Sequence, residues 1–289
     1  DYMRRCTPLT MPISHSTKPQ KTSGSMKRYW LFSMSKEEEL LRACEEVKNL
    51  TYTQGAYTIF KVWEPKERLI MALPFYDRVV QHMIVNIIGP VFEQGFYYHS
   101  YACCEGKGMH AASEQLSQWM YELMIKEGLR LYGFKGDIHK YFASIPHNKL
   151  KEENRRYIGD KKALYLMDGI IDKNGILPDG VGIPVGNLTS QLFANVYGNK
   201  LDKFVKHTLH AKYYIRYMDD FILIHCDKWY LQYCLEEINK ACNEKLNLEL
   251  NQKTEIGIAY NGIDFLGFNH ILTGSDKAVS YTHLRAHET

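Results

Sequence analysis

Two adjacent carboxylates, Asp219 and Asp220, lie between two runs of β-branched and aromatic residues, 213–216 and 221–224. This pattern predicts a hairpin whose tip presents both acids at the edge of a sheet. Neighbouring carboxylates repel each other, and desolvating them without a partner is costly, so the pair favours a bound cation. An ordinary solvated turn is the alternative, because Asp is common in turns.

A third acid, Asp137, ends an apolar run at residues 129–138, far upstream of the pair. Mg²⁺ prefers oxygen ligands from carboxylates, backbone carbonyls and phosphates. Two such ions activate an attacking hydroxyl and stabilise the leaving oxygen of an in-line displacement at phosphorus. Asp137 alone would be read as a turn or capping acid, so this chemistry depends on convergence of all three side chains.

The elements that must position these acids are mixed in type. Apolar periodicity predicts a helix that begins at Ser35 and has Leu40, Leu41, Cys44 and Val47 on its apolar face. It also predicts helices over residues 77–91, 110–127, 150–172, 192–209 and 229–246. Alternating runs predict strands at 57–63, 68–73 and 129–138, and two strands in each of 212–224 and 254–268. Residues 174–186, rich in Gly and Pro, are expected to form a loop. Because strands and helices do not alternate regularly, we expect an α+β fold with helices on one face of the sheet.

Bulk properties permit many functions. The 289 residues carry 36 basic and 33 acidic side chains, which is too balanced to indicate a nucleic-acid-binding protein by itself. No run of eighteen apolar residues is present, so no membrane association is expected. Seven cysteines without C-x-x-C spacing argue against a disulfide framework and a zinc site, and fit a reducing cytoplasm. Residues 1–26 are expected to be irregular.

Together, Tyr217–Asp220 and Phe134–Phe142 resemble motifs C and A of the reverse transcriptase palm. The resemblance implies a right-hand polymerase fold, with fingers at 27–128 and an antiparallel palm sheet backed by helices at 129–270. It implies a two-metal site for Mg²⁺, with Mn²⁺ as a substitute, held by Asp137, Asp219, Asp220 and the backbone of Ile138. Phe142, five residues after Asp137, would be the steric gate that favours dNTPs over NTPs.

Further segments follow the order of that family. Residues 183–191 resemble motif B, 251–254 motif D, 262–268 the primer grip, and 66–70 and 77–80 the fingers motifs. The resemblance implies a catalytic proton donor at Lys253. It implies dNTP-binding roles for Arg68, Arg78, Phe142, Gly186 and Gln191, and nucleic-acid-binding roles for Lys107, Tyr217, Met218 and Gly267. Thr189 or Ser190 is expected to cap the helix after motif B.

The subtype depends on motif B, which has Val185 before Gly186 and Gln191 after Ser190. This resembles the enzymes of diversity-generating retroelements rather than group II intron or retron enzymes, which remain the alternatives, together with a non-catalytic nucleic-acid-binding relative. The subtype implies error-prone cDNA synthesis at template adenines in a bacterial or phage-encoded system. Its expected partners are template RNA, a primer or cDNA strand, dNTPs and a small basic accessory protein. Val185 lacks a side-chain amide that could check base-pair geometry.

Two departures from the family stand out. Gly198 lies inside the predicted helix after motif B, where Gly costs about 1 kcal/mol relative to Ala. No thumb follows Phe268, which predicts a weak grip on the primer-template duplex. Residues 271–289 are expected to be a truncated end that resembles vector read-through, without a core pattern.

Overall fold

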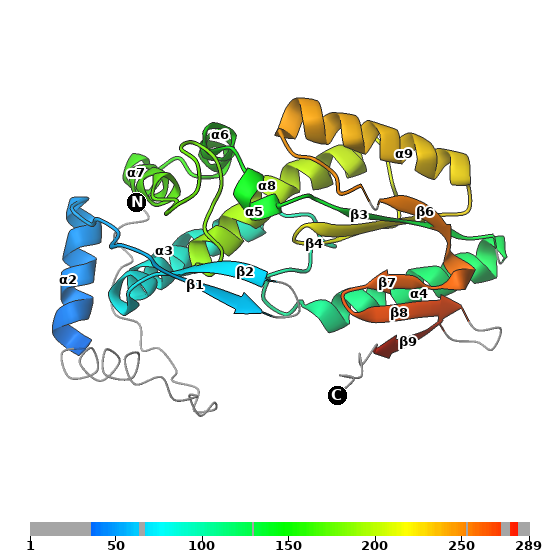
Figure 1. Ribbon diagram of the computed structural model, residues 1–289, viewed down its shortest axis with the longest axis horizontal. Helices are drawn as coiled ribbons and strands as arrows, with labels where there is room; N and C mark the ends of the chain where they lie inside the picture. Colours follow the sequence, from blue (N-terminus) through cyan, green and yellow to red (C-terminus); the bar gives the residue numbers. More distant parts are fainter. Residues whose placement is uncertain (1–35, 64–66, 129, 253, 273–277, 283–289) are drawn as a thin grey trace.

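The computed structural model describes residues 36–63, 67–128, 130–252, 254–272 and 278–282 (Figure 1). The helices in this part of the chain are α2 (Lys36–Asn49), α3 (Phe75–Glu93), α4 (Met109–Glu127), α5 (Tyr141–Ser144), α6 (His147–Tyr157), α7 (Lys161–Asp172), α8 (Leu188–His207) and α9 (Lys228–Ala241), which continues into a π-turn at Cys242–Leu246. None of these described helices has the length and apolar character needed to cross a membrane.

The strands form three antiparallel sheets. The central sheet has the order β4-β5-β3-β6 and is made of β3 (Tyr132–Asp137), β4 (Tyr214–Tyr217), β5 (Asp220–His225) and β6 (Glu255–Ile258). A two-stranded sheet pairs β1 (Thr58–Trp63) with β2 (Glu67–Ala72). The third sheet holds β7 (Ile263–Phe265), β8 (Phe268–Leu272) and β9 (Ala278–Thr282).

Alternation along β5 divides the core into two layers. Phe221 and Leu223 join a large cluster with α8 and α9, whereas Ile222 and Ile224 join a second cluster with α4. Figure 1 shows α9 and α4 on opposite sides of the central sheet. The expectation of helices on one face is therefore wrong, because strands that are apolar on both sides need two covering layers. By these contacts α4, which lies in the expected fingers segment, packs on the central sheet.

One glycine allows β3 and β5 to pack closely. A Cβ at Gly136 would lie 2.1 Å from the ring of Phe221, which is fully buried. No other residue fits beneath that ring without displacing it. Gly136 therefore keeps the paired ends of the two strands in register immediately before the predicted acid Asp137.

The β1–β2 hairpin lies beside the end of the central sheet (Figure 1). It connects to the loop before α8 through the backbone N–H of Met71, which donates to the carbonyl of Val185 at 3.2 Å. In the same region, α3 packs against α8. The predicted strands and the helix of this region are confirmed within a few residues.

Some local predictions were wrong. The helix expected at 150–172 is two helices, α6 and α7, because the helical conformation is interrupted before Asp160. The carboxylate of Asp160 accepts hydrogen bonds from the backbone N–H groups of Lys162 and Ala163 and so caps α7. α8 begins at Leu188 with Asn187 as its N-cap and no side-chain cap, so neither Thr189 nor Ser190 has the expected role.

Two further differences concern the ends of the described chain. Leu41 is 63% exposed, and Ala43 instead joins the apolar face of α2. A strand, β9, pairs with β8 inside the segment 271–289 where no element was expected. The expected irregular segment 1–26 lies outside the described residues.

Candidate active site at one end of the central sheet

Strand register brings the three predicted acids together. Asp137 is the direct partner of Asp220 in the β3–β5 pair, and Tyr217 pairs with Asp220 across the β4–β5 hairpin. This leaves Met218 and Asp219 as the two-residue turn. The backbone N–H of Ile138 donates to the carbonyl of Asp219 at 3.3 Å, which links the end of β3 to the turn. We call Asp137, Asp219 and Asp220 the carboxylate edge.

Asn251 fixes the first of these acids. Its backbone N–H donates to the carbonyl of Asp137 at 2.7 Å, and its side-chain Nδ2 donates to Asp137 Oδ2 at 3.0 Å. Sequence reasoning placed Asn251 in motif D only as a flanking residue. An amide held to both the backbone and the carboxylate of Asp137 restricts its rotation and leaves Oδ1 for another partner.

The electrostatic environment of Asp219 opposes ionisation. Burial raises the pKa of its carboxyl group above the ordinary value, and the negative charge of Asp137 raises it further. A hydrogen bond to its own backbone and the charges of Arg68 and Arg216 act in the opposite direction on this pKa. Asp219 is therefore close enough to Asp137 for repulsion, and a cation between them would relieve it.

The donor set fits hard divalent cations, since three carboxylates and the backbone of Ile138 supply only oxygen. Across the described residues, no three His, Cys, Asp or Glu side chains already converge on a single metal position. Strand register thus brings the backbone positions of the acids together. The free cysteines of the described chain, Cys103 and Cys104 among them, form no soft-ligand site.

Three predicted nucleotide-binding residues lie on α5, on α8 and in the loop before α8. Phe142 is partly buried on α5, and its carbonyl accepts from the N–H of Ile183 at 2.8 Å. Gly186 has φ +109°, a conformation that favours glycine, and a Cβ there would lie 3.1 Å from Ile70. Gln191 lies in the first turns of α8, where its Oε1 accepts from the thiol of Cys103 at 3.6 Å.

The two predicted phosphate-binding arginines differ in position. Arg68 is exposed on β2, and its charge lowers the pKa of Asp219, so it faces the carboxylate edge. Arg78 is exposed on α3, with its guanidinium 5.4 Å from the ring centre of Phe75. The charge of Arg68 thus acts on the carboxyl group of Asp219, whereas Arg78 is not among the charges that shift the pKa of this group.

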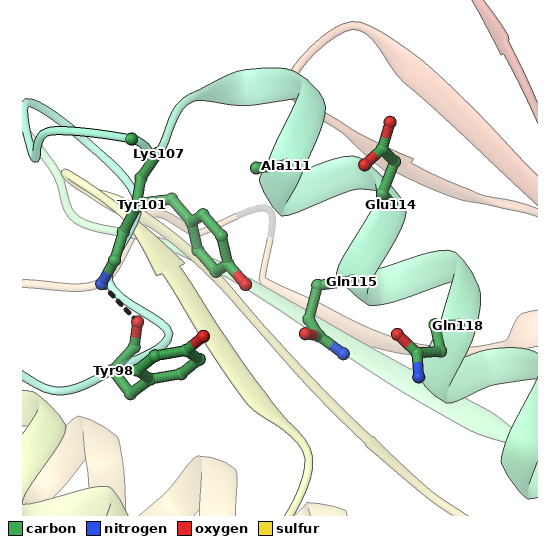
Figure 2. Close-up of a pocket in the computed structure, with 8 residues that line it drawn as sticks. Tyr98, Tyr101, Lys107, Ala111, Glu114, Gln115 and Gln118 are labelled. Carbon is green, nitrogen blue, oxygen red and sulfur yellow. Dashed lines mark hydrogen bonds between the residues drawn. The ribbon is translucent and has the colours of Figure 1, made fainter.

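Lys107 has a structural role that the sequence did not indicate. Its ammonium donates to the carbonyls of Tyr98 and Ser100 and lies over the rings of Tyr98 and Tyr101. Figure 2 shows this side chain turned towards Tyr98 at the rim of a pocket of about 250 Å³ beside α4. Lys107 therefore stabilises the loop between α3 and α4 through two hydrogen bonds to backbone carbonyls. One ammonium hydrogen is left for the predicted nucleic-acid contact.

The remaining predicted residues lie on two hairpins. Tyr217 is partly buried and Met218 is 8% exposed, so Met218 presents mainly its backbone at the turn. Gly267 is exposed in the β7–β8 turn, where it and Leu266 have positive φ angles of 83° and 55°. Lys253, the predicted proton donor, lies outside the described residues.

Comparison with known proteins identifies a family whose matching region includes the carboxylate edge. The family model described as reverse transcriptase (RNA-dependent DNA polymerase) matches residues 61–270. Protein YkfC of Escherichia coli is 26% identical over 142 residues, which cover 47% of this chain and 36% of that protein. An uncharacterized 91 kDa protein in the cob intron of Schizosaccharomyces pombe is 27% identical over 207 residues, which cover 68% of this chain and 23% of that protein. The chain thus spans about a third or less of these relatives.

Solved structures share the fold. Telomerase from Candida tropicalis, in complex with a fragment of telomeric RNA, superposes with a TM-score of 0.62 at 13% identity over 81% of this chain and 45% of that one. Telomerase from Candida albicans gives a TM-score of 0.57 at 14% identity over 84% and 49% of the two chains. These similarities confirm the α+β polymerase fold with fingers and palm.

Proposed function

Because the chain belongs to the reverse transcriptase family, we propose that it is an RNA-directed DNA polymerase that adds dNTPs to a primer. The observation that carries this proposal is the strand register that pairs Asp137 with Asp220 beside Asp219. Fingers at 27–128 and palm at 129–270 are part of the proposal, with α4 as a helix that supports the palm sheet.

Asp137, Asp219 and Asp220, with the carbonyl of Ile138, would hold two Mg²⁺ ions. When bound, these ions activate the primer 3′-hydroxyl and neutralise charge on the departing pyrophosphate. Asn251 keeps Asp137 oriented for this task. Arg68 would bind the triphosphate by charge-assisted hydrogen bonds, and the ring of Phe142 would exclude a 2′-hydroxyl.

The test is incorporation of a single dNTP on a primed RNA template at saturating template, with and without Mg²⁺. We expect Asp219→Asn to lower the rate by about 10³-fold, the equivalent of roughly 4 kcal/mol of transition-state stabilisation. Asp179→Asn is the matched control, because Asp179 is exposed in the 174–186 loop. Equal rates for Asp219→Asn and Asp179→Asn would contradict the proposal.

For the subtype, we propose the error-prone enzyme of a diversity-generating retroelement. Its support is motif B, where Val185 lies against β2 through the hydrogen bond to Met71 and so borders the nucleotide-binding side of the site. The similarity to the protein in the cob intron of Schizosaccharomyces pombe also fits the alternative, a group II intron type. The proposed partners are template RNA, the cDNA strand and a small basic accessory protein in the cytoplasm of a bacterial host.

Sequencing cDNA made by the wild type and by Val185→Gln tests the role of Val185 in this proposal. An amide at position 185 can form a hydrogen bond that Val cannot, so we expect fewer errors at template adenines in the variant. A several-fold fall at adenines, with the other three bases unchanged, supports the retroelement type. Identical adenine error rates in the two enzymes would remove Val185 from the explanation of low fidelity.

A further inference from the structure

Arg216, directly before the Tyr-Met-Asp-Asp turn, is fully buried and uses all five of its N–H groups. Nε and Nη2 donate to the two carboxylate oxygens of Asp202, both at 2.7 Å. Nη2 also donates to Ser100 Oγ at 3.0 Å, and Nη1 donates to Asn195 Oδ1 at 3.4 Å. The last bond runs from Nη1 to the backbone carbonyl of Met218 at 2.9 Å.

The bond to Met218 matters because of the backbone conformation there. Met218 has φ +57°, in the left-handed region that costs a residue with a side chain about 1–2 kcal/mol. In a two-residue hairpin turn, the carbonyl of this residue sets the direction in which the chain enters Asp219. A guanidinium fixed to Asp202 on α8 therefore holds a strained peptide unit immediately before a metal-binding acid.

Gly198 makes room for this arrangement. It lies on α8, and a Cβ there would be 2.6 Å from Nη1 of Arg216 and 3.0 Å from the hydroxyl of Tyr141. The helix thus accepts a residue of low helix propensity at the point where the guanidinium passes. The expected cost of Gly198 is explained by the space that Arg216 needs.

A buried ion pair is a weak contributor to stability, since well-packed apolar residues of similar volume stabilise as much or more. Stability alone therefore does not account for Arg216 and Asp202. We propose that Arg216 is a positioning residue that sets the conformation of the Met218–Asp219 turn and thereby the metal affinity of the carboxylate edge. This inference rests on the proposed function.

Two variants disturb the bond in different ways. Arg216→Lys keeps the positive charge opposite Asp202. It replaces the three nitrogens of the planar guanidinium group with a single ammonium nitrogen. Gly198→Ala keeps arginine at position 216, but its added methyl group displaces Nη1 of Arg216. The matched controls are Ser100→Ala, which removes a bond to Nη2 only, and Gly169→Ala on α7, where an added Cβ meets nothing within 4 Å.

Mn²⁺ affinity, measured from the electron paramagnetic resonance signal of the free ion, is the direct readout. Thermal unfolding and the Mg²⁺ dependence of single-dNTP incorporation accompany it. We expect both variants to weaken Mn²⁺ binding five- to tenfold and to raise the half-saturating Mg²⁺ concentration equally, with the rate recovering at high Mg²⁺. Both controls should stay within twofold of the wild type.

A rescue variant tests the route of the effect. Because Gly adopts positive φ without strain, Met218→Gly in the Arg216→Lys background should restore most of the Mn²⁺ affinity. Lower melting temperatures with unchanged Mn²⁺ affinity in the two variants would overturn the inference and leave Arg216 a core ion pair. Weakened affinity without rescue by Met218→Gly would overturn the role of the turn.

Failure of the proposed function gives a different result. A wild-type protein that neither binds Mn²⁺ nor incorporates dNTPs would remove the proposed function and this inference with it. A wild-type protein that does both, with variants that match it, removes the inference alone. If Arg216→Lys does not fold, Gly198→Ala with its Gly169→Ala control still decides between these results.

Discussion

The carboxylate edge and the β1–β2 hairpin border the same site but are held in different ways. Behind the carboxylate edge, Arg216 and Asp202 are both fully buried and α8 and α9 cover the sheet. The hairpin is a two-stranded sheet on which Phe60 is 45% and Trp63 70% exposed. An isolated two-stranded sheet is marginally stable.

This difference matches the tasks that the two regions would perform. Metal ligands must be held within a fraction of an ångström, which requires locked side chains behind them. An element that admits and releases a nucleotide has to open locally, so it belongs to the less stable part of a fold. We therefore expect substitutions behind the carboxylate edge to change stability, and substitutions on the hairpin to change nucleotide binding.

Asp202→Asn should give the largest effect on stability. The substitution leaves the buried charge of Arg216 without a counter-ion, which costs about 3–5 kcal/mol. The measurement is urea unfolding of wild type and variant. Phe60→Ala on the hairpin is the comparison, because its partly exposed ring should lower stability by only about 1 kcal/mol. Similar losses for the two variants would remove the distinction between the regions.

Arg68→Ala should give a smaller effect of another kind. Loss of a charge-assisted hydrogen bond to a phosphate, worth about 1.5–3 kcal/mol, should raise the KM for dNTP tenfold or more. Unfolding should be unchanged, because Arg68 is exposed. Steady-state kinetics measure this effect, with Lys61→Ala as control.

Lys61 is the sharper control because it lies on the same hairpin but on its opposite face. Lys61 pairs with Leu69, whereas Arg68 pairs with Val62, so the two cations point to different sides of the sheet. We expect Lys61→Ala to leave the KM within twofold. A matching rise in both variants would mean that general charge, rather than the position of Arg68, attracts the nucleotide.

The acids themselves could be predicted because their signal is local. Alternating apolar residues around Asp219 and Asp220 define a hairpin, and a carboxylate at the end of a strand defines Asp137. Their pairing required the order of four strands, which a single sequence does not encode locally. The family resemblance supplied the expectation that the three acids converge, and the observed register pairs Asp137 with Asp220.

The supporting residues could not be predicted from local pattern. Arg216 reads as a polar residue at the end of a strand, and Asp202 as one more acid on a helix. Their ion pair spans α8 and β4 and depends on the missing Cβ of Gly198, which the sequence presented only as a helix defect. The backbone contacts of Lys107 could not be predicted either, because a basic residue in a glycine-containing loop has the same sequence pattern whether it binds phosphate or its own backbone.

The smallest expected effect concerns the charge of Asp219. Burial and then the charge of Asp137 raise the pKa of its carboxyl group in the folded protein, so the folded state binds a proton more tightly than the unfolded state. The ionised group therefore destabilises the metal-free fold at pH values above the raised pKa, and this cost is lost as pH falls through it. Asp219→Asn removes the charge at every pH.

With EDTA present, we expect Asp219→Asn to melt at a higher temperature than the wild type at pH 7.5, and the difference to shrink towards pH 4.5. Exposed Asp179→Asn should show little difference from the wild type at either pH. Addition of Mg²⁺ at pH 7.5 should raise the melting temperature of the wild type more than that of Asp219→Asn, because a bound cation replaces repulsion with attraction. If the difference in melting temperature between the wild type and Asp219→Asn were the same at both pH values, the carboxylate edge would have no charge repulsion that a bound metal could relieve. The contrast with the hairpin would then rest on packing alone.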